Sequence, residues 1–464
     1  MRTEKDTLGK VSLPDEAYFG AQTKRAVDNF QISGLKLPRG FIKAQGIVKL
    51  AAVRANGALG LIDRRRSRAI EKAALEVVSG RHDEHFVVDV YQAGAGTSQN
   101  MNANEVIANR AVEIMGGEKG NYVLIHPNDH VNMAQSTNDT IPTAMYISAY
   151  EAVKTGLIPE LKAFQRELVK KAEKFDGIVK AGRTHMQDAV PIRLGQEFSG
   201  YAEAVSNNIS RLQNVSNELL YLPVGGNAVG TGINAHPAFR RNILREIKKI
   251  TGIKFRSSRN EFEGIQNVNP ALELSASLRS VSITLTKIAN DIRLMSSGPR
   301  TGFAEIILPA VQPGSSIMPG KVNPVMAEML NMVCFQVIGN DTTIAYAVQA
   351  SQLELNVMMP LIAHNLLTSI GILKNGVKAF TVKCVRGIKA DIKKCRGFAE
   401  ATLAMATALN TVIGYSSAAE VAKEAYRTGK TVKQTVIEKG ILSEKEANRL
   451  LDPMRLTGKR IKNC

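Results

Sequence analysis

The residues of this chain best suited to chemistry lie at positions 314–323, which read Gly-Ser-Ser-Ile-Met-Pro-Gly-Lys-Val-Asn. We name this segment the serine loop. Its two serines stand among glycines and prolines, so their backbone amides are not easily taken up by a helix or a strand. Such a loop can offer free N–H groups and hydroxyls to an anion, with Lys321 beside them. The composition therefore predicts a loop that carries function.

Three further segments are rich in hydroxyl and amide side chains. They cover residues 94–105, 126–139 and 182–188. Three of the four polar segments directly precede apolar residues with helical periodicity, and a helix N-terminus favours a carboxylate through its unpaired amides and its dipole. Any one segment alone is most simply interpreted as an N-cap. Four of them, together with the serines and Lys321, favour a shared site for a dicarboxylate.

A dicarboxylate would need different partners at its two ends. One carboxylate would be held by neutral donors, namely Thr97, Ser136, Thr137 and Asn138. The other would lie near Lys321 and Asn323, where positive charge and amide donors stabilise additional negative charge. This asymmetry suits removal of a proton alpha to a carboxylate, because the resulting carbanion delocalises into a doubly charged aci-carboxylate.

A base and an acid on opposite sides would complete an elimination or an addition across a carbon–carbon bond. Ser315 can act as the base only if loop amides and Lys321 stabilise its oxyanion. His185 is the natural opposing acid, since its side chain titrates near neutrality, and Glu328 could set its charge state. The competing interpretation of His185 is a buried, hydrogen-bonded structural histidine.

Long helices are expected to position these residues. The clearest apolar stripe, with steps of three and four, comprises Leu274, Leu278, Val281, Leu285, Ile288 and Ile292. Such a stripe is typical of a long helix packed against other helices, and alternating strand patterns are scarce. We therefore expect an all-α protein whose long-helix bundle is completed by oligomerisation. Its expected domains are a helical region at 1–140, the bundle at 141–396 and a small helical unit at 397–464.

Composition limits the function further. The 464 residues carry a net charge of +18, but aromatic residues make up only 5%, and a basic surface that attracts small anions explains the charge better than nucleic-acid binding does. The first residues lack the apolar region of a signal peptide, and no apolar run is long enough to span a membrane. Cys334, Cys384, Cys395 and Cys464 show neither metal nor disulfide spacing. We expect a cytoplasmic protein without metal or nucleotide, and a basic helical interaction protein is the competing non-enzyme hypothesis.

The serine loop and the three other polar segments resemble those of the class II fumarase and aspartase superfamily, and the resemblance extends over nearly the whole chain. It implies three all-α domains, a homotetramer whose central helices form one bundle, and active sites that each draw on three subunits. It implies Ser315 as catalytic base, His185 as proton donor and Glu328 as its partner, with no cofactor. The implied substrate contacts are Ala95, Gly96, Thr97, Ser136, Thr137, Asn138, Thr184, Ser316, Lys321, Val322 and Asn323. A secondary anion site is implied at His126, Pro127, Asn128 and Asp129.

The choice of member within the superfamily depends on a few positions. The run Phe19-Gly20-Ala21-Gln22-Thr23, the segment at 126–129 and the run at 408–415 look like fumarase. Ala95 and Thr137 stand where fumarases usually carry serine, and both look like aspartase. The sequence predicts a tricarboxylic acid cycle enzyme that interconverts fumarate and (S)-malate, with conversion of aspartate to fumarate and ammonia as the alternative.

Overall fold

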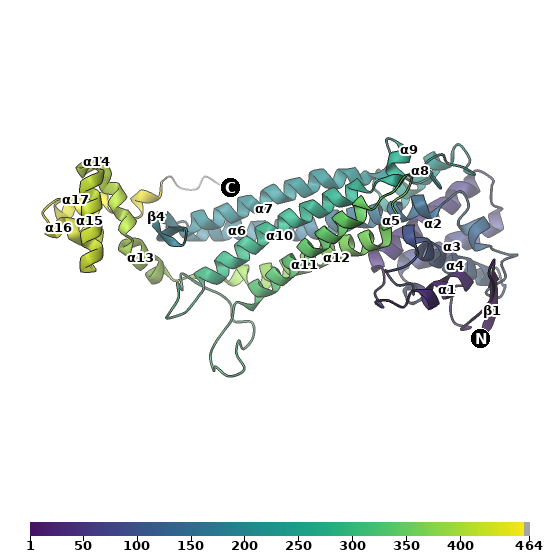
Figure 1. The fold of residues 1–464 in the computed structure, drawn as a ribbon, viewed down its shortest axis with the longest axis horizontal. Coiled ribbons are helices and arrows are strands. Elements are labelled where there is room, and N and C mark those ends of the chain that lie inside the picture. The colour runs from purple at the N-terminus through teal and green to yellow at the C-terminus, as the bar shows by residue number, and fades with distance from the viewer. Residues whose placement is uncertain (459–464) are drawn as a thin grey trace. The chain divides into compact units, whose positions relative to one another are not determined.

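The protein is described by a computed structural model over residues 1–458, and its helices dominate the ribbon (Figure 1). The first helices are α1 (Ala21–Asn29), α2 (Arg39–Ala58), α3 (Arg64–Ser79), α4 (Thr97–Ile114), α5 (Thr137–Glu151), α6 (Ile158–Phe175), α7 (Leu194–Ser216), α8 (Phe239–Thr251) and α9 (Glu261–Gln266). They are followed by α10 (Asn269–Met295), α11 (Val325–Gln349), α12 (Met359–Lys383), α13 (Ile392–Ala401), α14 (Asn410–Ile413), α15 (Tyr415–Thr428), α16 (Val432–Glu438) and α17 (Glu444–Leu450).

The strands of the described residues form only two-stranded pairs. They are β1 (Arg2–Asp6) with β2 (Gly9–Leu13), β3 (Val179–Thr184) with β4 (Gln187–Arg193), β5 (Tyr221–Leu222) with β6 (Arg256–Ser257), and β7 (Ile306–Ile307) with β8 (Lys389–Ala390). A two-stranded pair cannot bury a core by itself. The helices therefore carry the core, and the prediction of an all-α fold is confirmed.

Contacts along the chain define two compact units. Unit 1 comprises Met1–Ile158, Ser210–Ser280 and Phe335–Leu373, and unit 2 comprises Pro159–Ile209, Val281–Cys334 and Lys374–Cys464. Cys334, Cys384 and Cys395 are free, buried thiols, whereas Cys464 lies outside the described residues. The division into three domains at 140 and 396 stays a prediction.

Helix α2 lies at the centre of unit 1. It packs against α3, α5 and α8, and its residues Leu50 and Val53 belong to a buried apolar cluster with Ile70 and Val106. Gly46 allows the close approach of α3, because a Cβ at that position would lie 3.0 Å from Val78 Cγ2. The small residues of α2 thus let neighbouring helices pack tightly around it.

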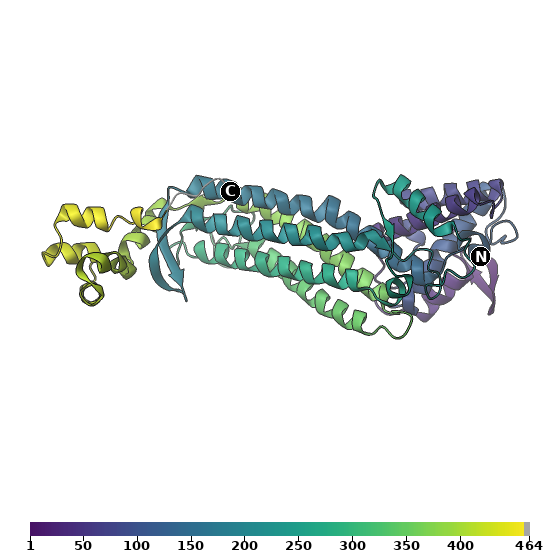
Figure 2. The ribbon, with the colours of Figure 1, turned by 90° about the horizontal axis from the view of Figure 1, so that it is seen from above.

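Long helices also build unit 2. Helices α6 and α7 run beside the parts of α10, α11 and α12 that belong to this unit in both views (Figures 1 and 2). The rings of Phe175 and Phe198 join α6 to α7, and those of Phe164 and Phe380 join α6 to α12. The apolar stripe of α10 is at most 1% exposed at every position, so the predicted long helix is confirmed. Among residues 1–458, no helix combines the length and the apolar character needed to cross a bilayer.

Candidate active site

The serine loop closes on itself at its two ends. Gly314 N donates to Lys321 O at 2.9 Å, and Asn323 Nδ2 donates to Gly314 O at 2.5 Å. A Cβ at position 314 would lie 2.5 Å from both Asn323 N and Lys321 O, so only glycine fits there without moving backbone. The loop therefore has a defined neck, with Ser315 directly beyond it.

Ser315 is hydrogen-bonded to the backbone of its own loop. Its Oγ accepts hydrogen bonds from Met318 N at 2.9 Å and from Ile317 N at 3.3 Å. Both donors are neutral backbone amides aimed at the oxygen that would carry negative charge after loss of its proton, and such preorganised donors stabilise an oxyanion. The loop amides thus meet one of the two conditions that the sequence set for Ser315 as a base.

A pocket of about 1010 Å³ lies beside the neck of the loop in unit 2. Lys321, Val322, Asn323 and Glu328 all line it. Glu328 is in the first turn of α11, where the helix dipole favours its negative charge. Unit 2 therefore brings together the cation and the amide predicted to hold one carboxylate.

His185 is at the tip of the hairpin formed by β3 and β4. His185 (φ 52°) and Met186 (φ 62°) both adopt left-handed backbone conformations, as a tight two-residue hairpin turn requires. His185 is exposed in the single chain, so the core of its own chain does not bury it. The hairpin is anchored below its tip, because Arg183 Nη1 lies 2.8 Å from Glu305 Oε1. Within the described residues, no hydrogen bond joins His185 to Ser315 or Glu328.

Unit 1 brings two helix N-termini together. Thr97 begins α4 after Ala95 (φ 60°) and Gly96 (φ 86°), and Ser136 caps α5 by accepting from Asn138 N at 3.2 Å. A Cβ on Gly96 would lie 3.1 Å from Ile141 Cγ1 of α5, so the two helix ends are in van der Waals contact. Some of their amides already have partners, since Gln99 N donates to Gln92 Oε1 and Asn138 N to Ser136 Oγ, but the dipoles of two adjacent helix N-termini both favour an anion.

Buried groups beneath these helix ends were not predicted from the sequence. Asp139 accepts hydrogen bonds from Ser136 N, Gly225 N and Asn227 N, and burial raises its pKa to about 6. Lys49 is 1% exposed, and burial lowers its pKa to about 7, an effect that Asp139 opposes. The available signal was a single lysine in the apolar run Ile47-Val48-Lys49-Leu50-Ala51.

The segment at 126–129 begins a short π-helix, Pro127–Val131. His126 Nδ1 accepts from the backbone amides of Asn128 and Asp129, each at 3.2 Å, and lies 3.4 Å from Asp129 Oδ2. Two amides that an anion would use are thus bonded to His126. The secondary anion site stays a prediction.

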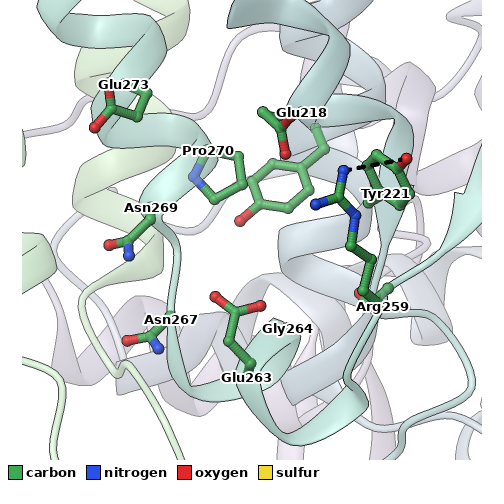
Figure 3. A pocket seen from close by; sticks show the side chains of 11 residues that line it. Glu218, Tyr221, Arg259, Glu263, Gly264, Asn267, Asn269, Pro270 and Glu273 are labelled. Carbon is green, nitrogen blue, oxygen red and sulfur yellow. Dashed lines mark hydrogen bonds between the residues drawn. The ribbon is translucent and has the colours of Figure 1, made fainter.

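A separate pocket of about 330 Å³ in unit 1 contains none of the predicted site residues (Figure 3). Glu218, Glu263 and Glu273 line it, and Arg259 Nη2 donates to Tyr221 Oη at 3.5 Å. Three carboxylates against one guanidinium would repel a dianion. This pocket is therefore unsuited to the predicted substrate.

The chain is similar to known proteins over nearly its whole length. The chain matches the family described as "Lyase" over residues 9–339 and the one described as "Fumarase C C-terminus" over residues 405–458. It is 51% identical to the class II fumarate hydratase of Halobacterium salinarum, covering 98% of this chain and 97% of that one. It is 49% identical to an aspartate ammonia-lyase of a Bacillus species, with the same coverage. A crystal structure of class II fumarase from Schistosoma mansoni is 36% identical and superposes with a TM-score of 0.96 over 98% of this chain and 99% of that one.

The chain therefore belongs to the lyase family, and its fold is that of the fumarases. Its relatives include both class II fumarate hydratases and aspartate ammonia-lyases, which confirms the predicted superfamily. Both relatives are lyases, so the prediction that the protein is a lyase is confirmed as well. Within residues 1–458, no group of three or more His, Cys, Asp or Glu side chains is placed to hold a metal ion.

Proposed function

We propose that this protein catalyses the reversible hydration of fumarate to (S)-malate by anti addition of water through an aci-carboxylate intermediate. The observation that carries this proposal is the pair of amide hydrogen bonds to Ser315 Oγ, from Ile317 N and Met318 N. Ser315 removes the proton from the carbon next to a carboxylate. The amides lower the cost of the serine oxyanion that this step requires.

The two ends of the substrate are held differently. Lys321 and Asn323 stabilise the carboxylate that becomes doubly charged, and the helix ends of α4 and α5 bind the other carboxylate through neutral donors. These donors are the backbone of Ala95 and Gly96 and the side chains of Thr97, Ser136, Thr137 and Asn138. Thr184, Ser316 and Val322 complete the contacts. His185, with Glu328 setting its charge, serves the departing hydroxyl as acid.

Several copies of the chain build each site in this proposal. The support is that His185 and Ser316 are exposed and Ser315 is half-buried in one chain, whereas catalysis of this kind needs a site that excludes water. A cytoplasmic homotetramer whose sites draw on three subunits would cover these groups.

A second candidate is the release of ammonia from aspartate. Ala95 and Thr137 favour it, because both look like aspartase and both lie at the helix ends proposed to bind substrate. The aspartate ammonia-lyase of the Bacillus species is also 49% identical over nearly the full chain. Water and ammonia are similar in size, so one site can serve either reaction.

The two candidates are separated by following the ultraviolet absorbance of the fumarate double bond, with malate or aspartate as sole substrate. The proposal predicts growth of the signal with malate and none with aspartate. Ser315→Ala should abolish the signal. Ser443→Ala is its matched control and should keep the signal, because Ser443 Oγ also accepts a hydrogen bond from a backbone amide, that of Glu446 at 3.3 Å, but caps a helix in the C-terminal region. A signal with aspartate alone would establish the second candidate. The absence of a signal with either substrate would refute both activities and favour the competing hypothesis of a basic helical interaction protein.

A further inference from the structure

Lys49 is a lysine in a place where proteins rarely put one. It lies in the middle of α2, is 1% exposed, and has no carboxylate within ion-pair distance among the described residues. Its Nζ instead donates to two neutral amide oxygens, Asn132 Oδ1 at 2.9 Å and Gln135 Oε1 at 3.0 Å. Burying an ammonium group without a paired anion is costly, and an apolar residue of similar volume would stabilise the helix core better. A purely structural role does not explain this residue.

A chain of hydrogen bonds leads from Lys49 to the helix end proposed to bind substrate. Asn132 Oδ1, which accepts from Lys49, also accepts from Asn100 Nδ2 at 3.2 Å. The same Nδ2 donates to Thr137 Oγ1 at 3.2 Å. Asn100 Oδ1 accepts from Thr140 Oγ1 at 3.4 Å, so both ends of this buried amide have partners. Asn100 is 1% exposed and Thr137 is 9% exposed, which leaves little water to compete.

Lys49 and the backbone together set the direction of these hydrogen bonds, because Asn132 Nδ2 also donates to Gln135 O at 3.2 Å and Gln135 Nε2 donates to Val131 O at 3.0 Å. An ammonium group can only donate, so the oxygens of Asn132 and Gln135 must face it. With Asn132 oriented in this way, Asn100 must present its NH₂ group to Asn132 and, through its second proton, to Thr137. Thr137 Oγ1 is thereby an acceptor inside the protein. Within the described residues its own hydroxyl proton has no acceptor, so it is free to be donated to a ligand.

We propose that Lys49 is a positioning residue that turns the Thr137 hydroxyl into a donor toward the substrate and places a buried positive charge beneath the carboxylate bound at the N-termini of α4 and α5. This inference rests on the proposed function, since it assigns a carboxylate to those helix ends. Without Lys49, only the hydrogen bond from Asn132 Nδ2 to Gln135 O holds Asn132 in this orientation, so rotation of Asn132 and Asn100 by half a turn costs less. Thr137 would then donate to Asn100 Oδ1, and the substrate would lose a hydrogen bond as well as the nearby cation.

The variant that tests this role is Lys49→Met, which keeps an unbranched chain and removes the charge and the donors. We expect KM for the dicarboxylate to rise about tenfold or more, since one charge-assisted contact contributes 1.4 kcal/mol or above. The turnover number should change much less, because Ser315 and Lys321 are untouched. The matched control is Lys43→Met, which removes a cation from the same helix where it is half-exposed and paired with Glu151. Its KM should equal that of the unaltered protein.

Two further variants keep the test decisive if Lys49→Met folds poorly. Asn100→Asp is nearly isosteric and has no NH₂ group, so Thr137 must donate to it, and KM should rise by a similar factor. Thr137→Val should also raise KM. Adding Lys49→Met to Thr137→Val should then raise KM by less than Lys49→Met does alone, because the two residues act through one contact.

The outcomes separate this inference from the proposed function. Absence of turnover by the unaltered protein would refute the proposed function. Normal turnover by the unaltered protein, with an unchanged KM in Lys49→Met or Asn100→Asp, would refute the role of Lys49. A lower melting temperature and less active protein at an unchanged KM would show that Lys49 is structural only, and would refute it equally.

Discussion

At the scale of single residues, the protonation of Lys49 should be visible in substrate binding. Burial lowers its pKa to about 7, and a dianion bound nearby would raise that pKa again. The protonated form is then the better binding form, so KM should rise as pH increases above about 7 and approach a tenfold change per unit. The charged group that faces Lys49 is Asp139, whose pKa is raised to about 6 by burial, so it is mostly ionised before Lys49 loses its proton.

The measurement is a series of KM values for malate, for the unaltered protein and for Lys49→Met. The pH runs from roughly 6 to roughly 9, a window around a pKa near neutrality. The variant should lose the rise above pH 7. A profile that is identical in both proteins would assign the titration to another group and would contradict the effect of Lys49.

Sequence reasoning found some residues of the site and missed others for a physical reason. The composition of the serine loop shows that its amides are free, so the contact of Ser315 with amides two and three positions away could be anticipated. Lys49 could not be assigned a role in the same way, because its partners Asn132 and Gln135 are 83 and 86 positions distant. Only the packing of α2 against the start of α5 brings them together.

At the scale of elements, the neck of the serine loop should be sensitive to one methyl group. In Gly314→Ala the new Cβ would lie 2.5 Å from backbone atoms of Lys321 and Asn323, which must move apart. We expect the turnover number to fall tenfold or more (about 1.4 kcal/mol of transition-state stabilisation) with little change in melting temperature, because the loop is largely exposed.

The control for this prediction is Gly320→Ala in the same loop. Nothing lies within 4 Å of a Cβ there, and the cost is limited to the positive φ of 79°, roughly 1 kcal/mol. Steady-state kinetics and thermal melts on both variants suffice. Equal turnover in Gly314→Ala and the unaltered protein would show that the neck does not direct Ser315.

The helices were more predictable than the turns. The apolar stripe of α10 repeats at steps of three and four over its length, and burial of that stripe follows from the pattern alone. The hairpin that carries His185 was not predicted. Its turn residues are His185 and Met186, which lack the Asn-Gly or Asp-Gly signature of such turns. The tertiary anchor between Arg183 and Glu305, 122 positions apart, holds it instead.

At the scale of the whole molecule, the proposed catalytic groups belong to two units. The helix ends proposed to bind one carboxylate are in unit 1, whereas Ser315, His185 and Lys321 are in unit 2. The fold class and the family could be predicted from motifs that span the chain. The assembly could not be derived from apolar stripes, because a stripe shows that a helix face is covered without showing which copy of the chain covers it.

The most direct test of the account mixes two inactive variants, Ser315→Ala and Asn138→Ala. Each variant alone should lose nearly all turnover, and the turnover of Ser315→Ala should fall about a thousandfold. If a site takes Ser315 and Asn138 from different chains, assemblies formed by joint refolding contain sites with both groups intact, and about a quarter of full activity should return. Differently tagged chains on a native gel would verify that mixed assemblies form. Mixed assemblies without restored turnover would contradict a site shared between chains.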